Sequence, residues 1–163
     1  MAQEIPGRTL GFVLSDVARL LRKRFEQRAR ADKLGLTRAQ SSVLAYLARQ
    51  EGINQAALAQ VLEIEPITLA RLIDRLQTAG VVERRPDPHD RRARLLYLSE
   101  QAYPLLDRIF SLAAEVREES LAGVPEPDRA RLLDMLLIMK ANLLSRAVEP
   151  PSRPGLQEVA VDG

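Results

Sequence analysis

The sequence contains no cysteine and a single histidine, His89. The lack of cysteine excludes disulfide bonds, a thiolate nucleophile, cysteine-based redox sensing and cysteine-ligated zinc. One histidine is too few for a zinc site that takes several His or Cys ligands from one chain, although carboxylates still allow a site for a hard cation. We therefore expect no catalytic metal site and no bound cofactor.

Aromatic residues are also scarce, at 4% of the chain. Proteins that recognise single-stranded RNA stack its bases on aromatic rings, so this scarcity disfavours RNA binding. No apolar run approaches the roughly 20 residues that span a bilayer. The first twelve residues lack the basic and apolar regions of a secretory signal. The simplest interpretation is a cytoplasmic protein that has no membrane partner.

Charge is plentiful but nearly balanced. The chain has 163 residues, about one domain by length, and carries 24 Lys and Arg against 22 Asp and Glu, a net charge of +2. Only three of the basic residues are lysine. Residues 8–38 are mostly basic among their charged positions, whereas residues 100–149 are mostly acidic. The basic side chains are therefore concentrated toward the N-terminal part.

Hydrophobic periodicity predicts a mostly helical chain. Apolar residues recur at steps of three and four over residues 9–31, which indicates one long amphipathic helix. Thr37 is suited to begin a second helix that runs to about Gln50 and is closed by Gly52. Asn54 is suited to begin a short third helix.

A fourth helix is predicted from Pro66, whose missing N–H costs nothing at the first helical position, to Gly80. Its apolar stripe contains Leu69, Leu72, Ile73 and Leu76. At 100° per residue the opposite side presents a mixed face. That face consists of Ile67, Thr68, Arg71, Asp74, Arg75 and Thr78.

Two strand-like runs follow, at residues 81–85 and 94–98. Ser99 is suited to cap a further helix, which Pro104 should bend in its first turns. A last helix carries Leu132, Leu136, Met139 and Leu143 on one side. The Pro-rich stretch 148–163 has no periodicity and is expected to be disordered.

This order of elements points to DNA. Two short helices joined by a tight turn form a helix-turn-helix, whose second helix can lie in a major groove about 12 Å wide. The strand pair adds a wing, and its loop gathers five arginines: Arg84, Arg85, Arg91, Arg92 and Arg94. Arginine suits phosphates and the minor groove because its planar fork stays charged. Asp87 and Asp90 look misplaced beside phosphate, unless one of them braces a guanidinium group.

The segments "LARLIDRLQTAGVVERR" and "DRRARLLYLS" resemble, in order and spacing, the recognition-helix-to-wing region of the MarR family of bacterial transcription regulators, closest to its SlyA branch. The resemblance covers about residues 9–146. It implies that Arg92 reads the minor groove and that Asp90 braces it. The implied fold is mainly α with a small β-hairpin wing, a winged helix-turn-helix in a helical homodimer.

The resemblance also implies that different parts of the chain serve dimerisation and DNA binding. Residues 9–34 and 99–147 would form the helical dimerisation region, and residues 35–98 the DNA-binding domain. A small-molecule site would lie between them, for an aromatic carboxylate, a phenolic compound or an acyl thioester. In the stretch "VARLLR", Arg19 and Arg22 match positions that lie near a bound salicylate in the SlyA branch.

The sequence thus predicts a transcription regulator that binds double-stranded DNA as a dimer. Repression is the simpler way in which such a dimer could act on a promoter. The alternative is a winged-helix module that binds protein without DNA. An enzyme is disfavoured because no nucleophile–base pair and no glycine-rich phosphate loop is found. The residues predicted to contact DNA are Ile67, Thr68, Arg71, Arg75, Arg84, Arg85, Asp90, Arg91 and Arg92.

Overall fold

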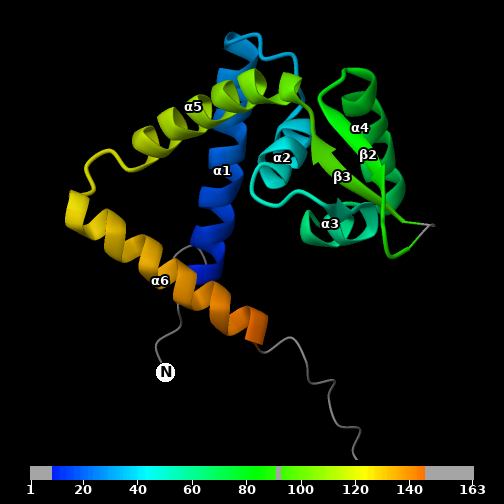
Figure 1. Ribbon diagram of the computed structural model, residues 1–163. Helices are drawn as coiled ribbons and strands as arrows, with labels where there is room; N and C mark the ends of the chain where they lie inside the picture. The colour runs from blue at the N-terminus through cyan, green and yellow to red at the C-terminus, as the bar shows by residue number, and fades with distance from the viewer. Residues whose placement is uncertain (1–8, 91–92, 146–163) are drawn as a thin grey trace, which may run out of the picture. The chain divides into compact units, whose positions relative to one another are not determined.

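The computed structural model describes residues 9–90 and 93–145 of the chain (Figure 1). The expected fold, mainly helical with a small β wing, is confirmed. The elements in order are α1 (Leu10–Ala31), α2 (Arg38–Leu47), β1 (Ile53–Asn54), α3 (Gln55–Val61), α4 (Pro66–Thr78), β2 (Val82–Pro86), β3 (Arg94–Leu98), the 3-10 helix η2 (Glu100–Ala102), α5 (Tyr103–Ser120) and α6 (Glu126–Ser145).

The chain divides into two compact units after Ser120, the first holding α1 to α5 and the second holding α6. None of the described helices is long and apolar enough to cross a membrane. Residues 148–163, predicted to be disordered, lie outside the described residues.

The predicted starts of α2, α3 and α4 are confirmed, because each depends on residues only a few positions apart. The Thr37 side chain accepts the N–H of Gln40, and the Gln40 side chain accepts the N–H of Thr37, which makes a complete capping box at α2. Asn54 accepts the N–H of Ala57 at 2.8 Å and so caps α3. Pro66 occupies the first turn of α4, as predicted.

The end of α2 and the strand after it differ from the prediction. The helix ends at Leu47 rather than near Gln50, and Gly52 does not close it. The Gly52 N–H instead donates to the carbonyl of Leu96, and β1 follows as a third strand that pairs with β3. Two residues are too few to show the alternation that reveals a strand in sequence, which is why β1 was not predicted.

The three strands form an antiparallel sheet in the order β1-β3-β2. In the β2–β3 hairpin, Arg84 pairs with Leu96 and Arg85 with Leu95. Figure 1 shows the hairpin extending beside α4. The Leu96 side chain is fully buried, so the sheet is fixed to the core while its loop projects from it.

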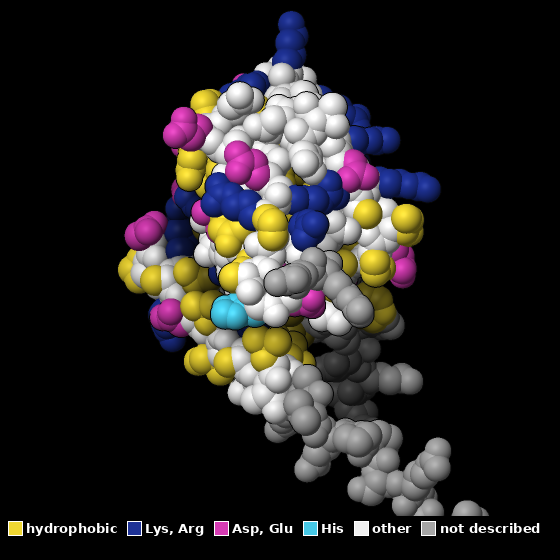
Figure 2. All heavy atoms as spheres, turned by 45° about the vertical axis from the view of Figure 1, so that its right-hand side comes forward, with side chains coloured by type: hydrophobic (Ala, Val, Ile, Leu, Met, Phe, Trp, Pro, Cys, Tyr) yellow, Lys and Arg dark blue, Asp and Glu magenta, His cyan; other side chains and the backbone are white. Residues whose placement is uncertain are grey.

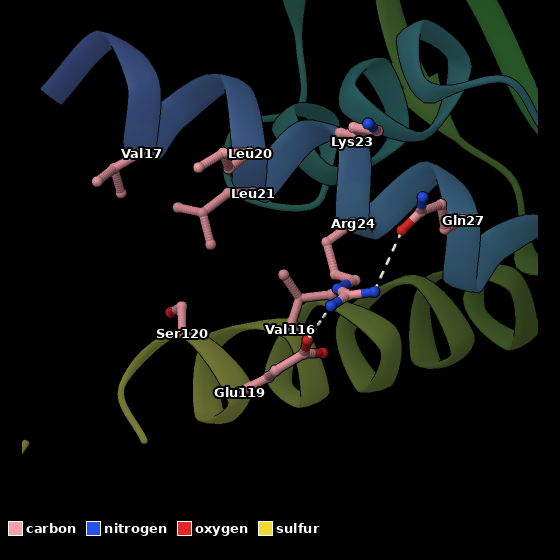
Figure 3. A pocket seen from close by; sticks show the side chains of 9 residues that line it. All are labelled: Val17, Leu20, Leu21, Lys23, Arg24, Gln27, Val116, Glu119 and Ser120. Carbon is pink, nitrogen blue, oxygen red and sulfur yellow. Dashed lines mark hydrogen bonds and ion pairs between the residues drawn. The ribbon is translucent and has the colours of Figure 1, made fainter. Parts of the chain in front are cut away.

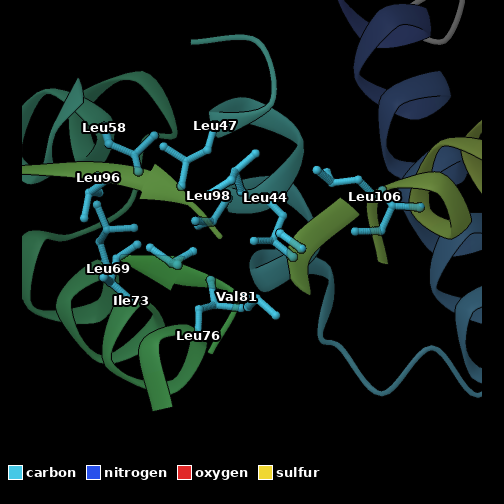
Figure 4. Close-up of a cluster of buried hydrophobic side chains, with 14 of the residues drawn as sticks. Leu44, Leu47, Leu58, Leu69, Ile73, Leu76, Val81, Leu96, Leu98 and Leu106 are labelled. Atoms are coloured by element: carbon cyan, nitrogen blue, oxygen red, sulfur yellow. The ribbon is translucent and has the colours of Figure 1, made fainter. Parts of the chain in front are cut away.

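The core lies where α2, α3, α4 and β3 meet, and it extends to the start of α5 (Figure 4). Each of these elements supplies apolar side chains at the spacing that the sequence predicted. Each fully buried apolar side chain stabilises the folded state by about 1.5–3 kcal/mol relative to the same side chain left exposed. The fully buried members include Leu44, Leu47, Leu58, Leu69, Ile73, Leu76, Leu96 and Val82.

The start of α5 corrects two expectations. The Ser99 side chain does not cap a helix; its hydroxyl donates to the carbonyl of Gly80 at 2.5 Å. Pro104 does not lie inside one continuous helix that begins after Ser99, because η2 ends at Ala102 and α5 begins only at Tyr103. Pro104 therefore lies in the first turn of α5, where a missing N–H is tolerated.

Helix α1 packs along α5, and ion pairs join the two helices. Arg28 donates to Glu115 at 2.5 Å and to Glu119 at 2.9 Å. Arg24 pairs with Glu119 at 2.6 Å. The hydrogen bond from Arg28 holds the pKa of Glu119 below its ordinary value, and the same bond raises the pKa of Arg28.

Candidate nucleic-acid interface

Helix α4 has two chemically different faces. Leu69, Ile73 and Leu76 are fully buried in the core, while Leu72 of the predicted stripe is only half-buried. Gly80, with φ of +73°, turns the chain from α4 toward β2. Any other residue there would be strained by this backbone, and its Cβ atom would lie 2.7 Å from Oε1 of Gln101.

The opposite face of α4 is open to solvent, as the sequence predicted. Ile67 is 64% exposed, and Thr68, Arg71 and Arg75 are exposed as well. The guanidinium groups of Arg71 and Arg75 form no ion pair or hydrogen bond with any other residue that the structure describes. The face therefore offers a methyl surface, a hydroxyl and two unengaged guanidinium groups, which are the groups that read base edges in a major groove.

The wing turn is held by one aspartate. The Asp87 side chain accepts the N–H of His89 at 2.8 Å and that of Asp90 at 3.4 Å, an Asx-type turn. The N–H of Ala93 donates to the carbonyl of Asp90 and closes the loop. Asp87, which looked misplaced in sequence, therefore shapes the turn.

Arg91 and Arg92 were both predicted to contact DNA, Arg92 in the minor groove, and both lie outside the described residues. The structure consequently does not test the brace between Asp90 and Arg92. That pair stays a prediction from the sequence.

Arg84 and Arg85 are neighbours on β2 with different surroundings. Arg85 is exposed, pairs with Glu83 at 3.1 Å and lies over the Tyr97 ring, 4.4 Å from its centre. Arg84 is only 22% exposed and binds Asp74 at 2.7 Å. Neighbouring side chains of a strand point to opposite faces, but nothing in the sequence indicated that Asp74 is the partner of Arg84.

Figure 2 turns the lobe of α3, α4 and the hairpin toward the viewer. Both basic and acidic side chains stand out from this surface. Its arginine side chains can attract the phosphate backbone of DNA by a charge effect that does not depend on sequence. Among the described residues, no group of His, Asp and Glu is arranged to hold a metal ion.

Two hollows lie beside α1 in the first unit. One, of about 510 Å³, lies between α1 and α5 and is lined by Val17, Leu20 and Leu21 at its apolar end (Figure 3). The Arg24–Glu119 ion pair lies at its other end.

The second hollow, of about 430 Å³, lies among α1, α2 and α5. Its apolar lining includes Phe25, Ile109 and Val116. Its polar lining includes Arg22, Arg38, Ser41 and Arg117.

The two arginines predicted to bind an effector differ in position. Arg22 lines the second hollow, whereas Arg19 lines neither hollow and pairs with Asp16 at 3.0 Å. Ser41, which no sequence pattern singles out, is only 3% exposed, and its hydroxyl has no hydrogen-bond partner in the described structure.

Comparisons with known proteins agree with this architecture. A MarR family model matches residues 34–93, which include α2 to α4 and β2. The chain is 37% identical to the transcriptional regulator PA3341, with a TM-score of 0.72 over 85% of this chain and 100% of that one. It is 29% identical to a MarR transcriptional regulator from Methanosarcina mazei Go1, with a TM-score of 0.75 over 83% and 96% of the two chains.

Wild-type MarR from E. coli is 25% identical, with a TM-score of 0.71 over 80% of this chain and 96% of that one. The fold and these matches define a winged helix-turn-helix regulator of transcription. The chain belongs to the MarR family. Members of this family are DNA-binding regulators and not enzymes, so the enzyme interpretation is excluded.

Proposed function

We propose that this regulator binds a pseudo-palindromic operator as a homodimer, represses transcription there, and releases DNA when a small organic anion binds. We also assign it to the SlyA branch, on the match of its helix-to-wing segment. Such a regulator works in the cytoplasm, where bacterial DNA is. The observation that carries the proposal is the open face of α4, where Arg71 and Arg75 have no partner among the described residues.

In this proposal α4 enters the major groove with Ile67, Thr68, Arg71 and Arg75 toward the bases. The side chains of Arg85, Arg91 and Arg92 follow the backbone and the minor groove, and Asp90 braces Arg92. The buried stripe of α4 supports this arrangement, because it fixes the angular position of the outward face.

The test compares the recognition helix with the wing. Duplexes that the wild-type chain enriches from a randomised library serve as the specific probe, and the unselected library serves as the control. Arg71→Ala should weaken binding to the selected duplex by about 1–3 kcal/mol and relax its sequence preference. Arg92→Ala should weaken binding to the selected duplex by a similar amount.

Arg131→Ala, on α6, is the control for loss of one positive charge. An Arg71 variant that keeps full affinity and full preference for the selected duplex would remove α4 from the reading role. A chain that enriches no duplex at all would leave the protein-binding alternative.

The dimer proposal rests on apolar side chains that one chain leaves in solvent. On α1, Phe12 is 61% exposed and Leu20 is 52% exposed. Helix α6 has no buried residue, and Ile138 is 61% exposed. Exposed apolar surface of this extent marks interaction sites, and a second copy of the chain offers the same surface.

The effector proposal rests on the hollow among α1, α2 and α5. Its apolar wall suits an aromatic ring or the body of an acyl thioester, and its guanidinium groups suit a carboxylate or phenolate. We propose that Arg22 and Arg38 hold the anion and that the Ser41 hydroxyl donates to it. Arg19 stays a prediction from the sequence, and its pair with Asp16 favours a surface role.

A further inference from the structure

Arg84 was predicted to contact DNA, but its surroundings support another role. We propose that Arg84 is a positioning residue that holds α4 at a fixed orientation to the wing and acts on DNA through that helix. The inference rests on the proposal that α4 reads the operator. It goes beyond that proposal because it assigns sequence preference to a side chain that touches no base.

The Arg84 guanidinium joins three elements. It donates to Asp74 at 2.7 Å and to Gln77 at 2.5 Å, both on α4. It also donates to Gln55, the first residue of α3, at 3.4 Å. Its side chain is 22% exposed, whereas that of Arg85, the next residue, is 56% exposed. Arg84 is thus bound on several sides by the helix-turn-helix.

The backbone of Arg84 is itself firmly placed. It pairs in the β2–β3 ladder with Leu96, whose side chain is fully buried. The guanidinium fork is planar and presents its N–H groups in fixed directions. Because one end of this side chain is fixed to the sheet and the other to α3 and α4, the two helices cannot rotate against the wing without breaking hydrogen bonds.

This arrangement also accounts for Asp74. The residue is exposed on the outward side of α4, where a free carboxylate would repel phosphates. Arg84 compensates its charge and directs it toward β2. An ion pair that is partly exposed stabilises a fold little. The expected benefit is therefore an orientation of Arg71 and Arg75 that fits successive base pairs.

The experiment measures how strongly the chain prefers the selected duplex over the unselected library, at several salt concentrations. Arg84→Ala should lower this preference about tenfold, which is about 1.4 kcal/mol. The slope of log affinity against log salt should stay the same, because no phosphate contact is lost. Arg84→Lys keeps the charge but not the fork and should not restore the preference.

Asp74→Ala separates the positioning role from a simple charge effect. Loss of a negative charge from this face should tighten binding to both probes alike and leave the preference unchanged. The positioning role instead predicts a weaker preference for the selected duplex. Glu100→Ala, which removes an exposed carboxylate without a partner among the described residues, is the matched control and should leave the preference unchanged. Asp74 is also exposed, so its replacement should not prevent folding.

Two results would overturn the proposal. A salt slope reduced by about one in Arg84→Ala, with equal losses on both probes and rescue by Arg84→Lys, would make Arg84 a phosphate contact. An unchanged preference in both Arg84→Ala and Asp74→Ala would show that orientation does not depend on this cluster. If the wild-type chain does not prefer the selected duplex over the unselected library, α4 does not recognise a DNA sequence. That result would refute the proposed function and the positioning role with it.

Discussion

Ser41 combines burial with an unused hydrogen-bonding group. Its hydroxyl is excluded from water and has no partner in the described structure, and the residue belongs to the lining of the hollow among α1, α2 and α5. A buried hydroxyl without a partner costs about 1–3 kcal/mol. A bound anion would recover that cost, which is the physical basis for placing the effector there.

Ser41→Ala should therefore have two opposite effects. The free energy of unfolding of the free protein should stay equal or rise by up to about 1 kcal/mol, because an unsatisfied group is removed. Binding of aromatic carboxylates and their thioesters should weaken about tenfold. Urea unfolding gives the first quantity, and calorimetric titration gives the second.

Arg38→Ala should also weaken binding of the carboxylates, whereas Arg19→Ala should not if its pair with Asp16 is its only role. Arg38 pairs with Glu26 at 3.1 Å, so its loss also removes one contact between α1 and α2. If Ser41→Ala binds every acid as tightly as the wild type, the hydroxyl is not part of the site.

At the scale of elements, the contact between α1 and α5 depends on charge as well as on packing. The apolar side of α5 is buried through Leu106, Ile109 and Leu112. Arg28 and Arg24 then connect α1 to Glu115 and Glu119 at the far end of α5. These carboxylates must be ionised for the connection to form.

This connection should make stability depend on pH in the acid range. The folded protein lowers the pKa of Glu119, so its contribution is complete above the ordinary glutamate pKa of about 4.3 and is lost as the pH falls through the lower folded value. The difference in unfolding free energy between wild type and Glu119→Gln should shrink over that window. Urea unfolding across acid pH measures it.

Glu118→Gln is the control, because it removes a carboxylate from the same turn of α5 and leaves the pairs of Glu119 with Arg24 and Arg28 in place. A constant difference between wild type and Glu119→Gln from neutral to acid pH would show that the ion pairs do not stabilise the folded chain.

At the scale of the whole molecule, the exposed apolar residues of α1 and α6 predict a symmetric dimer. We expect sedimentation of the wild-type chain at micromolar concentration to give a dimer. Ile138→Glu should shift it toward monomer, because a charge in an apolar interface is costly to bury. Asp107→Lys, an exposed change on α5, should leave the dimer intact.

The same symmetry should appear in the DNA. A two-fold dimer should protect two half-sites whose centres lie about 34 Å apart, one helical turn. A footprint without two-fold character, or a wild-type chain that stays monomeric at these concentrations, would contradict the dimer proposal.

The parts of the fold that the sequence predicted are those that local rules decide. Thr37, Asn54 and Pro66 begin helices because capping involves residues only a few positions apart. The outward face of α4 follows from its period and needs no knowledge of the partner elements. The β hairpin follows from two apolar runs around a turn.

What the sequence by itself determined, therefore, was the order of elements, the faces of α4 and the charge of the wing, because each depends on periodicity or on neighbouring residues. Only the tertiary structure decided the pairing of β1 with β3, the binding of Arg84 to Asp74, and the position of Ser41 in a hollow. These contacts join residues brought together by packing, and no local pattern encodes which distant side chain will meet which.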